Sequence, residues 1–323
     1  WKGGLLALFL LAFDPNILAH AAVAGTDLGA ACFITLALFN LYRFLRRRTM
    51  FRLILAGVTL GLALGSKTSA VLLLPAAILL GLLVLPQRRL LSLVWLLLIA
   101  GLTLWGLYGF EMSPIPGIPF PVPAASHVIP WLRLRQHALD GHTAFLMGEN
   151  RTHGWWYYFP VAFALKTPLP TLLLLVAGAI AGFSGLAAQR FSNLESRICD
   201  LRSAIRRWGA LALFPLVYGA SSLFSPLNIG YRHLLPALPP LFILTGCLSI
   251  TRNTQYAIRI PYSVFRVACL AWLALSTLSI SPHYLAYFNE LAGGPDDGWR
   301  YLADSNTDWG QGYKALARFQ KER

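Results

Sequence analysis

Residues 90–110 read LLSLVWLLLIAGLTLWGLYGF, a run of 21 residues without one charged side chain. A helix needs about 20 apolar residues to cross the hydrocarbon core of a bilayer, so this stretch is long enough to span a membrane. The whole chain has the same character, because 56% of its 323 residues are hydrophobic and only 12% are charged. Soluble domains carry roughly 25% charged residues. The sequence therefore predicts an integral membrane protein.

Further apolar windows predict membrane helices along most of the chain. In order, they fall at residues 28–45, 53–65, 69–85, 90–110, 161–183, 208–224, 234–250 and 264–280. A shorter run at 3–13 brings the expected number of helices to nine. We interpret this run as the rest of a helix that begins upstream; a secretory signal is the alternative. The prediction is an all-α, polytopic transmembrane bundle over residues 1–281, including an outer loop at 111–160, followed by an extracytoplasmic tail or further domain at 282–323.

The net charge of +14 is distributed unevenly between the loops. Alternate loops carry arginine clusters, whereas eleven of the thirteen acidic residues fall in the opposite set. The positive-inside rule places the arginine-rich loops in the cytoplasm, so the charge is an orientation signal and requires no nucleic-acid partner. These arginines are Arg43, Arg46, Arg47, Arg48, Arg52, Arg88, Arg89, Arg190, Arg197, Arg202, Arg206, Arg207, Arg252 and Arg259.

Polar side chains gather at the outer ends of the first predicted helices. Asp14 precedes a proline, His20 follows it, and Asp27 begins the next helix. As an alternative to a functional role, Asp14 only ends a helix and Asp27 only caps the next one. Two carboxylates and a histidine within fourteen residues exceed what capping requires, and such a set can position a base, a metal or a donor hydroxyl. Asp14 and Asp27 are therefore candidate catalytic residues, and His20 is a candidate substrate ligand.

Cationic side chains lie on the same outer side. Lys67 sits where two helices meet, and Arg232 and His233 open another helix. Cations at a helix N-terminus are electrostatically unfavourable unless an anion is present. With Arg151 of the outer loop, they are candidate ligands of a phosphate. Snorkelling of these side chains to lipid headgroups is the alternative.

The outer loop combines stiff and aromatic segments. Five prolines between residues 114 and 123 predict an extended start, and the mixed basic and apolar residues 131–137 predict a helix lying in the membrane interface. The loop ends in an aromatic run that includes Tyr157 and follows His153. These two residues and Tyr231 are candidate substrate ligands, while an interfacial aromatic belt is the alternative.

Gly57, Gly61 and Gly65 repeat every four residues, which predicts close helix packing.

A set of short motifs resembles one enzyme family. In these motifs the chain is similar to bacterial relatives of the dolichyl-phosphate-mannose protein mannosyltransferases, glycosyltransferase family 39, which share the GT-C fold with lipid A aminoarabinose transferases. The matching stretches are Asp14-Pro-Asn-Ile-Leu-Ala-His20, Gly25-Thr-Asp27, Gly65-Ser-Lys67-Thr, Trp155-Trp-Tyr-Tyr-Phe-Pro160, Leu165-Lys166-Thr-Pro-Leu-Pro170, Asn228-Ile-Gly-Tyr-Arg-His-Leu-Leu-Pro236, Tyr287-Phe-Asn-Glu-Leu-Ala-Gly-Gly294 and Asp304-Ser-Asn-Thr-Asp-Trp-Gly-Gln311.

The resemblance implies a function at the bacterial inner membrane. Such enzymes move a sugar, with inversion, from a polyprenyl-phosphate carrier to an acceptor hydroxyl of a protein, lipid or glycan on the extracytoplasmic face. Asp27 would match the acidic residue of their second outer loop. Their first outer loop, which carries the acidic residue taken as the base, would precede Trp1, so we expect an N-terminally truncated chain that is inactive by itself.

Other classes of protein stay open at this stage. A carrier or flippase of lipid-linked or anionic substrates would also use boundary charges, although repeated halves are expected of it and none is visible. A scaffold subunit would leave the polar groups unexplained. No cofactor is certain: the four cysteines lack metal-type spacing, and a divalent cation is an open alternative.

The expected topology can be tested with reporter fusions. Because arginine-rich loops are retained in the cytoplasm, fusions after Arg48, Arg89, Arg207 and Arg259 should report the cytoplasm. Fusions after His142, Asn228 and Gly294 should report the opposite side. One loop that is reproducibly inverted would contradict the placement of the polar residues on one side.

Overall fold

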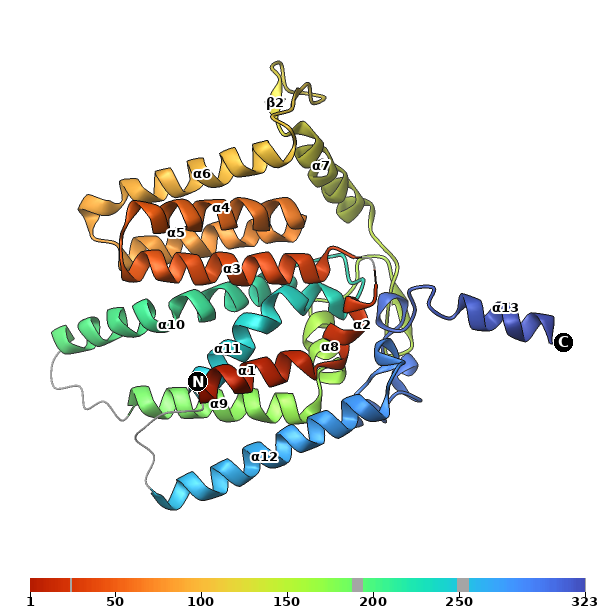
Figure 1. Cartoon of the computed structure of the whole chain (residues 1–323). Helices are drawn as coiled ribbons and strands as arrows, with labels where there is room; N and C mark the ends of the chain where they lie inside the picture. Colours follow the sequence, from red (N-terminus) through yellow and green to blue (C-terminus); the bar gives the residue numbers. More distant parts are fainter. Residues whose placement is uncertain (24, 188–193, 249–255, 323) are drawn as a thin grey trace.

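The computed structural model describes residues 1–322 apart from 24, 188–193 and 249–255, and these residues are mostly helical (Figure 1). The α-helices are α1 (Lys2–Ala12), α2 (Pro15–Ala21), α3 (Asp27–Arg46), α4 (Met50–Ser66), α5 (Leu73–Val84), α6 (Leu91–Leu107), α7 (Ala125–Asp140), α8 (Tyr158–Lys166), α9 (Leu169–Ala187), α10 (Leu194–Ser222), α11 (Leu238–Leu248), α12 (Tyr256–Ser279) and α13 (Tyr313–Lys321). The 3-10 segments used below are η1 (Thr68–Leu72), η3 (Tyr231–Ala237) and η7 (Asp304–Asn306).

Several of these helices are long and apolar enough to cross a membrane. Three stretches qualify within the described residues, namely Asp27–Arg46, Gln87–Leu107 and Tyr262–Ser279. Two bent pairs, α1 with α2 and α8 with the first part of α9, raise the number to five if each is one span. The helical membrane architecture is confirmed, but the predicted nine spans are not. Bends are one reason, because the window at 161–183 turns by 111° between α8 and α9.

The helices pack around two apolar cores. Helices α3, α4, α5, α6 and α10 enclose the first core, which includes Ile34, Leu60 and Leu96. Helices α1, α8, α9, α11 and α12 enclose the second, which includes Leu10 and Phe242. Figure 1 shows α3, α4 and α6 side by side, while α1 lies on the other side of α10 and α11. Segment η3 contacts α3, α8 and α10, so it lies where the two groups of helices meet.

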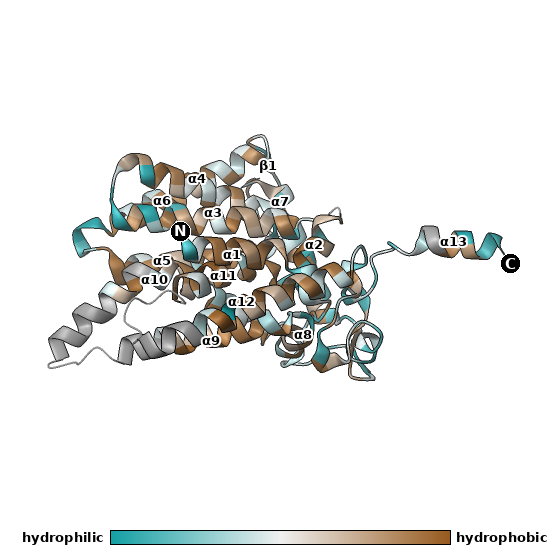
Figure 2. Cartoon of the chain, turned by 60° about the horizontal axis from the view of Figure 1, so that its bottom comes forward, coloured by the Kyte–Doolittle hydropathy of each residue, from teal (hydrophilic) through white to brown (hydrophobic). Residues whose placement is uncertain are grey.

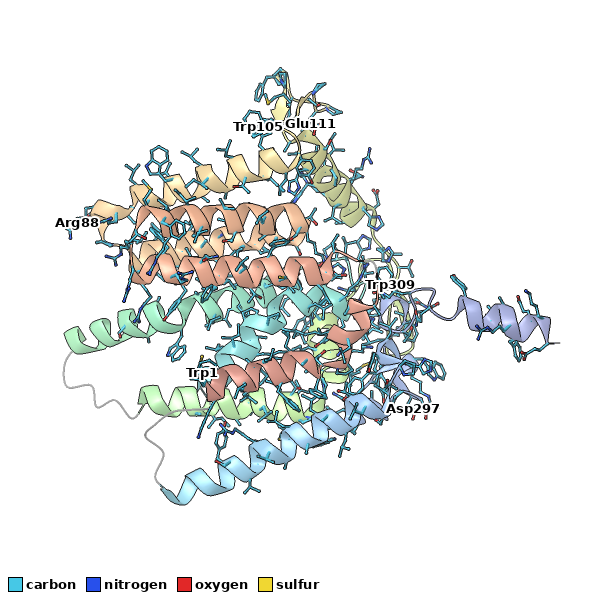
Figure 3. The ribbon with its side chains drawn as sticks, viewed as in Figure 1. Trp1, Arg88, Trp105, Glu111, Asp297 and Trp309 are labelled. Carbon is cyan, nitrogen blue, oxygen red and sulfur yellow. The ribbon has the colours of Figure 1, made fainter. Side chains whose placement is uncertain are left out.

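Polar and apolar residues are separated along the bundle. Figure 2 shows apolar residues along the helices, with polar residues at the α3–α4 and α5–α6 turns and in the segments at the opposite end. Figure 3 places Arg88 at the first end and Glu111, Asp297 and Trp309 at the other. This arrangement agrees with the predicted separation of arginine-rich and acidic loops. Arg190 and Arg252 lie outside the described residues, as do the side chains of Arg197, Arg202, Arg206, Arg207 and Arg259.

The long loop between α6 and α8 is ordered by two hairpins and a helix. Strand β1 (Met112–Ser113) pairs antiparallel with β2 (Val122–Pro123), and β3 (Ala144–Leu146) pairs antiparallel with β4 (Glu149–Arg151). Helix α7 between them contains the predicted interfacial segment 131–137. A bridge from Leu146 to Leu302 joins this loop to the tail that follows α12.

Close packing of α4 on α6 confirms the prediction made from the glycine repeat. A Cβ atom at Gly61 would lie 2.5 Å from the carbonyl oxygen of Ala100, and one at Gly57 would lie 2.7 Å from the Ile99 side chain. The α6 backbone therefore approaches α4 at a distance that a larger residue would prevent.

We expect Gly61→Val to separate α4 from α6 and to destabilise the protein by about 2 kcal/mol, the usual cost of overpacking. Thermal unfolding of the purified protein in detergent measures the effect. Gly101→Val is the matched control, because a Cβ atom at Gly101 of α6 meets nothing within 4 Å. Equal unfolding midpoints for the two variants would contradict the packing argument.

Candidate functional site

The break between α1 and α2 is made by Asp14. Its Oδ1 atom accepts hydrogen bonds from the backbone N–H groups of Asn16, at 2.9 Å, and Ile17, at 3.0 Å. Asp14 therefore caps α2. The predicted helix stop is confirmed as well, because α1 ends at Ala12. The carboxylate is fully buried, and its Oδ2 atom has no hydrogen-bond partner. Helix α2 then places His20, which is also buried, near the start of α3.

Asp27 is the first residue of α3, and its carboxylate binds cations from two other segments. Its Oδ1 atom forms an ion pair with Nζ of Lys67, and its Oδ2 atom lies 4.0 Å from a terminal guanidinium nitrogen of Arg232. Thr26 occupies the N-cap position, and no side-chain capping bond is present there. The structure thus brings together three predicted site residues that are far apart in sequence, and the contacts of Asp27 are ionic.

Lys67 lies between the end of α4 and η1, in an extended backbone conformation. Its side chain is 12% exposed, and its ammonium group is paired with Asp27. Burial lowers the pKa of the Lys67 ammonium, and the Asp27 carboxylate opposes that shift. A lysine that snorkels to lipid headgroups would instead extend its ammonium group into the polar layer.

Arg232 and His233 come from η3, at the junction of the two helix groups. The Arg232 guanidinium lies over the ring of Trp309, 4.5 Å from its centroid. Trp309 also meets the His20 ring edge-on at 6.5 Å between centroids. Burial lowers the pKa of the His233 imidazole to about 3, so this ring is neutral at pH 7, and its Nε2 atom is buried without a hydrogen-bond partner. At neutral pH, His233 is therefore a hydrogen-bonding group without charge.

A second buried polar network holds the tail against the bundle. Lys166 is fully buried, and its ammonium group donates to the carbonyl oxygens of Leu285 and Asn306, both at 2.8 Å. The Asn306 side chain accepts from the backbone N–H of Tyr231 at 2.9 Å and donates to the Tyr158 hydroxyl at 2.9 Å. This network positions the segment that carries Trp309.

A groove begins beside the ion pair of Lys67 with Asp27. It encloses about 320 Å³ and is lined by Lys67 and His233 together with apolar residues and serines. A second cavity of about 210 Å³ shares Phe159, Tyr218 and Ser222 with the groove and is lined by residues of α8, α10, η3 and α11. The lining of this cavity is mainly apolar. The polar cluster therefore lies at one end of a hydrophobic path between helices, and it consists of His20, Asp27, Lys67, Arg232 and His233.

The remaining predicted ligands have other contacts. Arg151 lies in β4, pairs with Glu149 at 3.1 Å and covers the Trp155 ring at 5.1 Å. His153 is exposed, with its ring 3.2 Å from the Thr152 hydroxyl, and Tyr157 packs on Trp156. The Tyr231 hydroxyl is buried and shares a hydrogen bond of 2.9 Å with Thr167. The contacts recorded for these residues do not include Asp27 or Lys67.

Residues 2–108 match the family of dolichyl-phosphate-mannose-protein mannosyltransferases. This segment runs from α1 through α6 and contains the predicted site residues Asp14, His20, Asp27 and Lys67. No curated protein and no solved structure matches the chain.

Two residues at the candidate site were not predicted from the sequence. Trp309 and Lys166 both belong to motifs that carry the family resemblance, but neither was assigned a role. A tryptophan in a polar tail carries no local signal of what it covers, whereas a lysine next to an apolar run could have been suspected from the cost of burying it. Within the described residues, no group of three or more His, Cys, Asp or Glu side chains is arranged to hold a metal ion.

The ion pair predicts a specific pattern of stability. Asp27→Asn should lower stability by about 3 kcal/mol, because it leaves the buried Lys67 ammonium uncompensated. Adding Lys67→Gln should restore part of the loss, since both charges are then removed. Thermal unfolding in detergent measures the cycle, and Asp297→Asn, which breaks the exposed pair with Arg300, is the control. Additive losses from the two site substitutions would show that these charges do not interact.

Proposed function

We propose that this protein is a GT-C-type glycosyltransferase that transfers a sugar from a polyprenyl-phosphate carrier to an acceptor hydroxyl. The observation that carries the proposal is the hydrophobic groove that begins at Lys67 and His233. A polyprenyl-phosphate sugar has a long apolar chain, one phosphate and a polar sugar, so it requires these two environments side by side. The match to the mannosyltransferase family supports the same substrate class.

The cations are suited to the phosphate of such a donor. Lys67 supplies a compact charge, while the planar guanidinium of Arg232 can hold two phosphate oxygens. Asp27 contacts both side chains and keeps them close together before the donor arrives. Asp27, Lys67 and Arg232 together carry one net positive charge, which favours an anion.

The reaction we propose is an inverting displacement. The acceptor oxygen attacks the anomeric carbon from the face opposite the phosphate, the bond from that carbon to the phosphate oxygen breaks, and the phosphate leaves with the bonding electrons. The acceptor proton passes to a base. Negative charge grows on the leaving phosphate, so fixed cations there stabilise the transition state more than the ground state.

Roles for the other residues follow from their places. His20 is proposed to contact the sugar, because it is buried beside the cation cluster. Asp27 is engaged with two cations and Asp14 caps α2, so we propose that both carboxylates orient the site. Arg151, His153 and Tyr157 are proposed to meet the donor or acceptor from the outer loop. Tyr231 of η3, whose hydroxyl is bonded to Thr167, is proposed to hold the substrate-binding segment in place. A divalent cation stays an alternative.

The proposed setting is the extracytoplasmic face of a bacterial inner membrane. The polar cluster lies at the end of the bundle opposite the arginine-rich turns, as Figure 3 illustrates with Arg88 and Trp309. A carrier would need groups that a substrate can reach from both faces. The one-sided cluster therefore favours an enzyme that receives its lipid donor from the membrane and its acceptor from the outer aqueous phase.

The test measures transfer by the protein expressed from its complete open reading frame, with a polyprenyl-phosphate mannose as donor. Lys67→Gln and Arg232→Lys should each lower kcat by on the order of a hundredfold, because both alter stabilisation of the leaving phosphate. Arg300→Lys is the control, since Arg300 is an exposed arginine paired with Asp297. Unchanged kcat in both site variants would refute the phosphate assignment. Movement of labelled donor across the membrane without sugar release would identify a carrier.

A further inference from the structure

The segment after η7 returns to the candidate site and presents Trp309 there. A local set of hydrogen bonds shapes this turn: the backbone N–H of Trp309 donates to Oε1 of Gln311 at 2.6 Å, and that of Gly310 donates to Oδ1 of Asp308 at 2.8 Å. The Gln311 side chain also donates to the Thr307 carbonyl oxygen at 3.0 Å. These bonds hold the backbone at Trp309 in place.

The turn is anchored to the segment that carries Arg232. Asn306 accepts from the backbone N–H of Tyr231, and the Ser305 hydroxyl donates to the carbonyl oxygen of Ile229 at 2.8 Å. Residues 305–309 thus run beside residues 229–232. Because these bonds are buried or partly buried, the two segments form one structural unit, and Trp309 and Arg232 meet as a consequence.

The guanidinium of Arg232 lies over the face of the Trp309 ring. Its centre lies 4.5 Å from the centroid of the Trp309 ring, which is the geometry of a cation–π contact. Its terminal nitrogen is 4.0 Å from Asp27, too far for a hydrogen bond, and its Nε atom is buried without a partner. Among the residues that the structure describes, Arg232 donates no hydrogen bond, so its N–H groups are available to a ligand.

We infer that Trp309 is a positioning residue that orients Arg232 for the phosphate of the lipid donor. The inference rests on the proposed function. A free arginine side chain loses rotamer freedom when it binds an anion. An aromatic ring that already restricts the guanidinium reduces this loss of conformational entropy. Trp309 thereby acts on phosphate affinity through Arg232.

The test is a double-mutant cycle on binding. The purified protein in nanodiscs is titrated with undecaprenyl phosphate, which has the phosphate and the apolar chain but no sugar. Trp309→Leu should weaken binding about tenfold, and Trp309→Tyr should keep most of the affinity because it retains an aromatic face. In the Arg232→Lys background, Trp309→Leu should change Kd by less than about twofold, because the planar group that it orients is already gone.

Trp299→Leu is the matched control. Trp299 is an exposed tryptophan of the same tail, and Arg300 covers its ring at 5.6 Å, so the same kind of contact is removed away from the site. Its Kd should equal that of the wild type. Unfolding midpoints of all variants show whether any loss of binding comes from unfolding.

The outcomes separate the two proposals. Equal weakening by Trp309→Leu in the wild-type and Arg232→Lys backgrounds would refute the positioning role while leaving a glycosyltransferase that binds its donor. A comparable loss in Trp299→Leu would refute it as well. A wild-type protein that binds no undecaprenyl phosphate would overturn both the inference and the proposed function.

Discussion

The ion pair between Asp27 and Lys67 is the constraint on which the candidate site depends. Charges near a bilayer are costly to bury, and a buried carboxylate is tolerated when cations compensate it. Asp27 begins α3, Lys67 follows α4, and Arg232 belongs to η3, so their pairing requires three distant segments to end at one place. The groove that begins there follows from this convergence, because α8, α10 and α11 pack around the same junction.

A second constraint holds the polar tail over that junction. The buried ammonium of Lys166 finds its partners in backbone carbonyl groups of the tail, and Asn306 connects the tail to η3 and α8. These hydrogen bonds replace those that the polar groups would otherwise form with water, so the tail is a structural part of the site. Trp309 reaches Arg232 and His20 because of this attachment. One end of the bundle is consequently polar, closely connected and open to a hydrophobic groove.

Features that depend on near neighbours in the chain could be predicted well. The helix break at Asp14, the close packing at Gly61 and the helix that contains residues 131–137 each depend on a few adjacent residues, and the structure has all three. The number of membrane spans could not be predicted in this way. A hydropathy window does not detect a bend, and the apolar run across α8 and α9 turns by 111°.

By itself, the sequence determined that this is a helical membrane protein with polar groups at one set of helix ends, because hydrophobicity and charge are properties of each residue. Only the tertiary structure decided which of those groups meet. Lys67 and Arg232 share Asp27, which is distant from both in the sequence, whereas Arg151 pairs with Glu149, only two residues away. The physical reason is that an ion pair depends on distance in space, and for residues 27, 67 and 232 that distance is set by how the helices pack.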